Sequence, residues 1–94
     1  MEVKEIFAKR LKELLEEKEI TKYKFAKEIN VNKQTVSFWL DGINEPKISY
    51  LKTIADYFNV SSDYLIGRQD GYWVLQEQDN IEKNKLSQSV PTKL

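Results

Sequence analysis

The chain has 94 residues, of which 40% are hydrophobic and 32% are charged. This composition suits one small core and leaves too few residues for a second independent domain. The absence of cysteine excludes disulfides and thiolate metal sites and suits a reducing interior. The charged start of the chain does not resemble a secretory signal, and no stretch approaches the roughly 18 apolar residues of a membrane span. We therefore expect a cytoplasmic protein without a membrane partner.

The charges cancel overall but are unevenly distributed. Fifteen Lys and Arg residues balance fifteen Asp and Glu residues. Residues 20–42 carry four lysines against Glu28 and Asp41, whereas residues 13–19 carry four glutamates. A local excess of lysine suits an anionic partner, but one such unit without a net positive charge should bind weakly and with strong salt dependence.

The first predicted helix covers residues 3–18. Its apolar residues recur at steps of three and four, which places them on one face. The residues expected to point inward are Val3, Phe7, Leu11, Leu14 and Leu15.

Two shorter helices follow, over residues 22–29 and 33–41. Thr21 and Asn32 are each placed to cap a helix start, since their side-chain oxygens can accept from free backbone N–H groups. Asn30 and Gly42 are expected to end the two helices in the left-handed conformation. The inward residues are expected to be Phe25, Ala26 and Ile29 in the first, and Val36, Trp39 and, at the edge of the apolar face, Leu40 in the second.

A fourth helix of about eleven residues is predicted to start near Pro46 or Lys47 and to end at Asn59. A short fifth helix is expected to start after the cap Ser61 and to run through Ile66, closed by Gly67. The inward face of the fourth helix is expected to comprise Ile48, Leu51, Ile54, Ala55 and Phe58. These elements predict an all-α fold of five helices over residues 1–68.

Residues 69–94 have a different character and are expected to form a C-terminal extension. A brief apolar cluster at residues 72–75 precedes a polar stretch with scattered apolar residues. The cluster could pack on the fifth helix and build a two-fold dimer interface, or it could fold back over its own core. The residues assigned to the candidate dimer interface are Tyr64, Ile66, Tyr72, Trp73 and Val74.

The segment of residues 20–42 has the layout of a helix-turn-helix DNA reader. Two short amphipathic helices are joined by a tight turn, and the second carries an outward row of Lys, Gln, Thr, Ser and Phe. A polar helix face supported by a compact apolar back fits the major groove of duplex DNA.

Residues 7–68 resemble the phage Cro and lambda-type repressor family of helix-turn-helix domains. Several linked positions agree with the family at once: Ala26, Val31, Trp39, Gly42, Pro46 and the run DYLIG at residues 63–67. There are two departures. Lys22 replaces the glutamine that usually opens the second helix and grips phosphate, so the orienting bond of the amide is lost, and Asn30 replaces the usual glycine of the turn.

The resemblance implies a lambda-repressor-like domain whose third helix reads bases in double-stranded DNA. Lysine can donate to guanine O6 and N7, glutamine can pair with adenine, and phenylalanine can meet a thymine methyl group. The candidate base contacts are Lys33, Gln34, Thr35, Ser37 and Phe38. The candidate phosphate contacts are Lys22, Lys24, Asn32, Asn44 and Lys47.

Together these features predict a transcriptional regulator, most simply a repressor, that acts as a homodimer on a near-palindromic operator. The chain contains no histidine, no cysteine and no glycine-rich phosphate loop, so we expect neither an enzyme nor a bound metal, cofactor or small-molecule ligand. The alternative is a protein-binding role, as an antitoxin whose C-terminal tail wraps its partner or as an adaptor. Zero net charge, Phe38 on the reading face and the apolar cluster at residues 72–75 favour this alternative.

Overall fold

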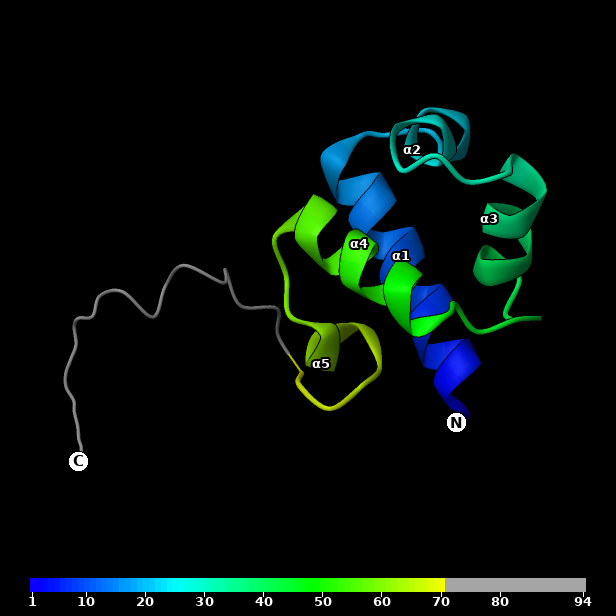
Figure 1. Cartoon of the computed structure of the whole chain (residues 1–94). Helices are drawn as coiled ribbons and strands as arrows, with labels where there is room; N and C mark the ends of the chain where they lie inside the picture. The colour runs from blue at the N-terminus through cyan, green and yellow to red at the C-terminus, as the bar shows by residue number, and fades with distance from the viewer. Residues whose placement is uncertain (71–94) are drawn as a thin grey trace, which may run out of the picture.

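The computed structural model describes residues 1–70 and places five helices in that part of the chain (Figure 1). Among these residues there is no strand, so the all-α prediction is confirmed. No helix in this region has the length and apolar character that crossing a membrane requires. The helices are α1 (Val3–Lys18), α2 (Lys22–Glu28), α3 (Lys33–Leu40), α4 (Ile48–Phe58) and α5 (Ser62–Leu65).

Side-chain caps fix where three of the helices begin. Thr21 Oγ1 accepts from the backbone N–H of Lys24 at 3.1 Å, and Asn32 Oδ1 accepts from that of Gln34 at 2.7 Å. Ser61 Oγ accepts from the backbone N–H of residue 64 at 3.0 Å. All three predicted caps are therefore confirmed.

The backbone is left-handed at the four residues predicted to end helices, and the conformation itself was predicted for Asn30 and Gly42. Asn30 and Asn59 have φ of 60° and 58°, and Gly42 and Gly67 have φ of 72° and 92°. Glu19 adopts the same conformation after α1, with φ of 57°. No residue type at this position predicts that conformation, because glutamate lacks the tolerance for this region that glycine and asparagine have.

The core is built around Trp39, which is only 2% exposed. Its ring meets Phe7 of α1 edge-on, with ring centroids 6.1 Å apart, and lies 5.7 Å from the ring of Tyr50 on α4. A second aromatic group joins α2 to α4, where Phe25 stacks on Phe58 at 5.4 Å. Aromatic pairs of this kind add stability beyond the apolar area they bury.

Two apolar residues that were predicted to face inward do not. Val3 is 44% exposed and Ile48 is 85% exposed. Each is the first residue of its helix, and helical side chains lean toward the helix N-terminus. The two side chains therefore project past the helix end instead of over the core.

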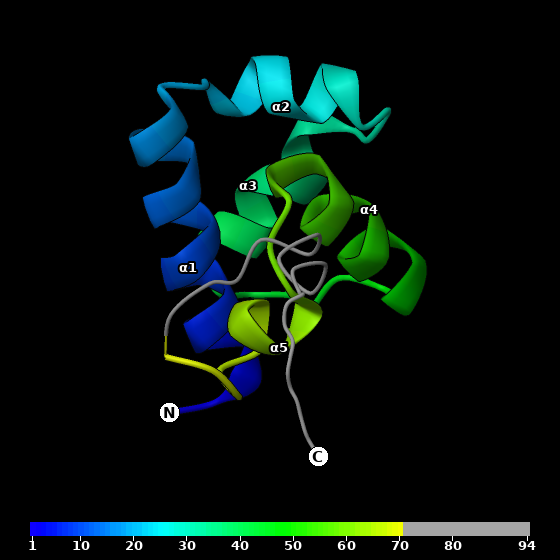
Figure 2. The same ribbon diagram turned by 90° about the vertical axis from the view of Figure 1, so that its left-hand side faces the viewer.

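α3 packs against both α1 and α2, and α5 packs against α1 and α4. In the two views α2 lies at one end of the molecule and α5 at the other (Figures 1 and 2). This arrangement leaves the side of α3 that turns away from α1 available to a partner.

Arg10 joins α1 to the end of the described chain. Its guanidinium lies over the ring of Tyr64, 4.4 Å from the centroid, and donates to the Tyr64 carbonyl at 2.6 Å. It also donates to the carbonyl of Gln69, whose side chain is bonded to the hydroxyl of Ser61. The fixed fork of an arginine suits such simultaneous bonds.

Tyr57 on α4 is tied to α2, because its hydroxyl donates to the carboxylate of Glu28. This hydrogen bond raises the pKa of Tyr57 to about 12, with smaller contributions from burial and from the charge of Glu28. The bond links α2 to α4 at the surface, beside the stacked pair Phe25 and Phe58.

Paired substitutions on α1 test the corrected inward face. Leu11 is fully buried, so Leu11→Ala should lower the free energy of unfolding by about 2 to 5 kcal/mol. Val3→Ala should change it by less than about 0.5 kcal/mol. Urea unfolding followed by circular dichroism measures both. A loss at Val3 as large as that at Leu11 would contradict the structure.

The link between Tyr57 and Glu28 predicts a loss of stability in alkali. The unfolded chain gives up the Tyr57 proton near the ordinary pKa of 10.0, whereas the folded chain keeps it to about 12. The contribution of this contact is therefore complete below pH 10 and is lost as the pH rises through 12. Urea unfolding at pH 9 and at pH 11.5 should show that the free energy of unfolding falls more between these two pH values for the wild type than for Tyr57→Phe. Equal falls would show that the contact does not hold the proton.

Candidate nucleic-acid interface

The two sides of α3 have opposite character. Val36 and Trp39 are buried against the rest of the domain, whereas Lys33 and Gln34 at the start of the helix are exposed. A helix anchored by one face presents the other as a rigid unit, which is what major-groove recognition requires. Of the remaining candidate base contacts, Thr35, Ser37 and Phe38 are half-buried.

Asn32, which caps α3, has a side-chain NH2 group that the cap does not use. Asn32 uses its side-chain oxygen to accept from Gln34. An asparagine amide also has an NH2 group with two donors. That group lies at the N-terminal end of α3, where the helix dipole favours an anion.

Lys22 connects α2 to α3. Its ammonium donates to Ser37 Oγ at 3.0 Å. This bond orients the lysine at the start of α2, so the loss of orientation expected from the missing glutamine is offset by a different contact. An ammonium has three donors, and this bond uses only one of them.

Tyr23, which the sequence reasoning did not select, lies between the expected phosphate and base contacts. Its side chain is 59% exposed. The ammonium of Lys33 is 5.1 Å from its ring centroid, and that of Lys22 is 5.7 Å away. Both distances lie within the range of cation–π attraction. The signal available in the sequence is an aromatic residue next to Lys22.

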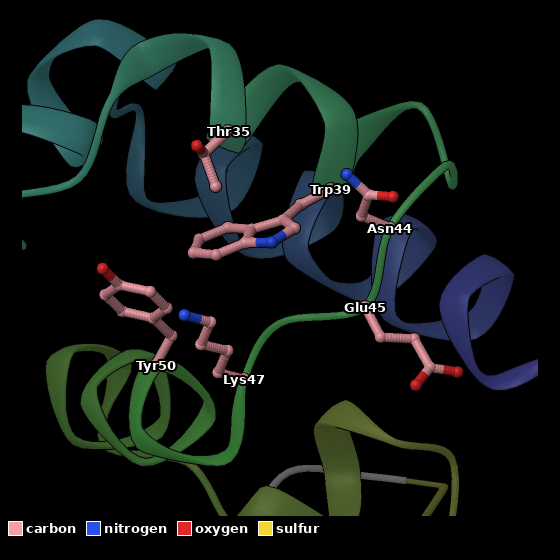
Figure 3. A pocket seen from close by; sticks show the side chains of 6 residues that line it. All are labelled: Thr35, Trp39, Asn44, Glu45, Lys47 and Tyr50. Atoms are coloured by element: carbon pink, nitrogen blue, oxygen red, sulfur yellow. The ribbon is translucent and has the colours of Figure 1, made fainter.

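A pocket of about 280 Å³ opens beside α3. Figure 3 shows Thr35 and Trp39 on α3 facing Lys47 and Tyr50 at the start of α4. Asn44 lies at the rim, and the carboxylate of Glu45 points away from the others. The pocket therefore brings three of the predicted contact residues, Thr35, Asn44 and Lys47, to one place.

The pocket and the start of α2 lie on different sides of α3. Lys22 contacts Ser37, while Thr35 and Trp39 line the pocket. Lysine and amide groups are thus available along both flanks of the helix. Lys24, the remaining candidate phosphate contact, is an exposed residue of α2.

The residues assigned to a dimer interface differ in their accessibility. Tyr64 is only 7% exposed and packs in the core of its own protomer under Arg10. Little of its surface remains for a second copy. Ile66, just after α5, is half-buried. Tyr72, Trp73 and Val74 lie outside the described residues.

The carboxylates of residues 1–70 do not gather into a group of three or more that could hold a metal ion. Ion pairs in this region are few and exposed, as between Lys52 and Asp56 at 2.7 Å. The polar groups around α3 are mainly amides, hydroxyls and ammonium groups, which are suited to bind phosphates and base edges.

Comparison with known proteins agrees with this geometry. Residues 11–65 match the family model described as helix-turn-helix. The chain is also similar to the solution structure of the SOS-response transcriptional repressor LexA from Eubacterium rectale, with 36% identity over 68% of each chain and a TM-score of 0.66. Among curated proteins, none matches this chain.

The family match covers more than half of the chain and includes α2 and α3 in full. The resemblance inferred from Ala26, Trp39 and Gly42 is therefore confirmed. The chain belongs to the Cro/C1-type helix-turn-helix family and is a DNA-binding transcription regulator.

Proposed function

We propose that the protein represses transcription by binding a near-palindromic operator as a homodimer, with α3 of each protomer in the major groove. One observation carries the proposal most directly: Lys33 and Gln34 are exposed on a helix whose opposite face, with Val36 and Trp39, is locked into the core. The name of the LexA structure, that of a transcriptional repressor, supports the direction of regulation.

Base reading is assigned to the outward face of α3. Gln34 can pair its amide with adenine N6 and N7, and Lys33 can donate to guanine O6 and N7. Thr35, Ser37 and Phe38 are half-buried, so each offers only part of its side chain to a base edge. We therefore assign the main discrimination to Gln34 and Lys33.

Phosphate binding is assigned to the two flanks of α3. On one flank are Lys22, with two donors beyond its bond to Ser37, and the amide of Asn32. On the other flank Asn44 and Lys47 line the pocket beside Trp39. Lys24 adds a further exposed charge on α2. Contacts on both sides of a recognition helix fix its register along the groove.

Dimerisation is proposed because each unit has no net positive charge with which to attract phosphate. Fifteen basic residues are balanced by fifteen acidic ones, and affinity from phosphate contacts rises with the number of charges neutralised. Two copies double that number and add a second reading helix about 34 Å away along the duplex. The buried position of Tyr64 directs attention to Ile66 and to residues 72–74 as the contact between copies.

Selection of bound DNA from a random duplex pool tests base reading. The wild type should enrich one sequence, and Gln34→Ala should lose its preference at one base pair at a cost of about 1 to 3 kcal/mol. Enrichment of no sequence by the wild type would refute the proposal and favour the role of a protein-binding antitoxin or adaptor.

Phosphate binding by Lys22 is tested with a matched pair of variants. Lys22→Ala should weaken binding evenly across sequences and reduce the slope of log affinity against log salt by about one. Ser37→Ala removes the same hydrogen bond but keeps the charge, so its salt slope should equal that of the wild type. Binding titrations at several salt concentrations measure both. Equal slopes for Lys22→Ala and the wild type would exclude the phosphate contact.

The dimer is tested on the selected sequence itself. Inserting about five base pairs between the two half-sites turns them to opposite sides of the duplex, since one helical turn is about 10.5 base pairs. Affinity should fall to that of an isolated half-site, and sedimentation should find two protomers on the intact operator. Equal affinity for one half-site and for both would show that the protein binds as a monomer.

A further inference from the structure

We infer that Tyr23 is a positioning residue that holds the ammonium of Lys33 in place for base reading and thereby sets specificity at one base pair. The inference rests on the proposed function. It adds a residue of α2, outside the reading helix, to the determinants of sequence preference.

The geometry singles out Lys33 as the partner of this ring. The Lys33 ammonium is 5.1 Å from the Tyr23 centroid, closer than the 5.7 Å of Lys22. Lys22 already has a partner on α3, because it donates to Ser37 at 3.0 Å. Among the described contacts of Lys33, the ring of Tyr23 is the one that restrains its ammonium.

The ring itself is well suited to act as a support. Tyr23 lies in the first turn of α2, whose start is fixed by the Thr21 cap, and the neighbouring α2 residues Phe25 and Ala26 are buried. Its own side chain remains 59% exposed. A tyrosine has few rotatable bonds, so it supports a flexible partner at a low cost in conformational entropy.

Restraint matters for lysine more than for the neighbouring glutamine. A lysine ammonium is a point charge on a four-carbon stem and can reach several acceptors in a groove or on the backbone. A ring beside it lowers the number of directions that it samples before binding. The ammonium then favours the guanine edge in front of α3 over nearby phosphates, which would accept it regardless of sequence.

The substitutions Tyr23→Leu and Tyr23→Phe separate positioning from other roles. Phenylalanine keeps the aromatic face, whereas leucine keeps only apolar bulk. Tyr23→Leu should lower affinity for the selected sequence about two- to fivefold, the range expected for an exposed cation–π pair. It should also weaken the base preference at the position where Lys33→Ala weakens it. Tyr23→Phe should keep both the affinity and the base preference of the wild type. Lys27→Ala, at an exposed site of α2, is the control for Lys33→Ala, because it also removes one positive charge.

A double-substitution cycle makes the test quantitative. If the ring acts through Lys33, then Tyr23→Leu should have no further effect on base preference when Lys33→Ala is present. Additive effects would overturn the inference. An even weakening across all sequences by both Tyr23→Phe and Tyr23→Leu would overturn it too, because the hydroxyl would then be a direct phosphate contact.

A measurement without DNA tests the ring contact alone. In the free protein, the methylene protons next to the Lys33 ammonium should resonate upfield of those of a lysine paired with a carboxylate, such as Lys52. The displacement should persist in Tyr23→Phe and vanish in Tyr23→Leu, and ordinary shifts in the wild type would overturn the contact.

The two levels of failure are distinguishable. A wild type that enriches no sequence would refute the proposed function and, with it, the specificity role, whatever the NMR shifts. A wild type that enriches a sequence while Tyr23→Leu keeps the full preference would overturn the inference about Tyr23 alone.

Discussion

The packing of one indole ring governs how this domain presents its surface. Trp39 lies on the inner side of α3 between Phe7 of α1 and Tyr50 of α4, and it is almost completely buried. Since a buried aromatic side chain contacts several elements at once, α3 cannot rotate without opening the core. The rotational position of Trp39 therefore also sets which side chains of α3 face outward, and it makes Lys33 and Gln34 the exposed ones.

The crossing of α2 and α3 creates the polar half of the same surface. Lys22 reaches Ser37, and Tyr23 approaches Lys33, so both links run from the first turn of α2 to α3. A chain with zero net charge needs such local organisation if it is to attract an anion, because its overall field offers little help.

The sequence predicted the elements well because the signals for them are local. Caps such as Asn32 and stops such as Asn59 act on backbone groups within a few residues, and the structure confirms both. The errors at Val3 and Ile48 arose at helix starts, where an apolar period continues in the sequence but the core no longer lies beneath it. The left-handed Glu19 was missed because glutamate is not a residue that signals this conformation. The structure shows the backbone N–H groups of Glu19 and Ile20 bonded to carbonyls of the last turns of α1.

The candidate site was only partly predictable for a different reason. The family motif directs attention to α3 and to Lys22, but the distance from Tyr23 to Lys33 depends on how two helices cross. The bond between Tyr57 and Glu28 likewise joins residues 29 positions apart. Sequence spacing specifies which residues are neighbours on the same helix. It does not specify which residues of two different helices come into contact.

The attachment of Gln69 to Arg10 has a practical consequence for handling the protein. Because the guanidinium of Arg10 binds the carbonyls of Tyr64 and Gln69, the backbone is held against α1 and α5 just before Asp70. α5 lies at the opposite end of the molecule from α2 (Figure 2). A fluorophore attached to a cysteine introduced at Asp70, in a chain that otherwise has none, thus starts far from the first turn of α2 and leaves residues 72–74 in place, which suits single-molecule experiments.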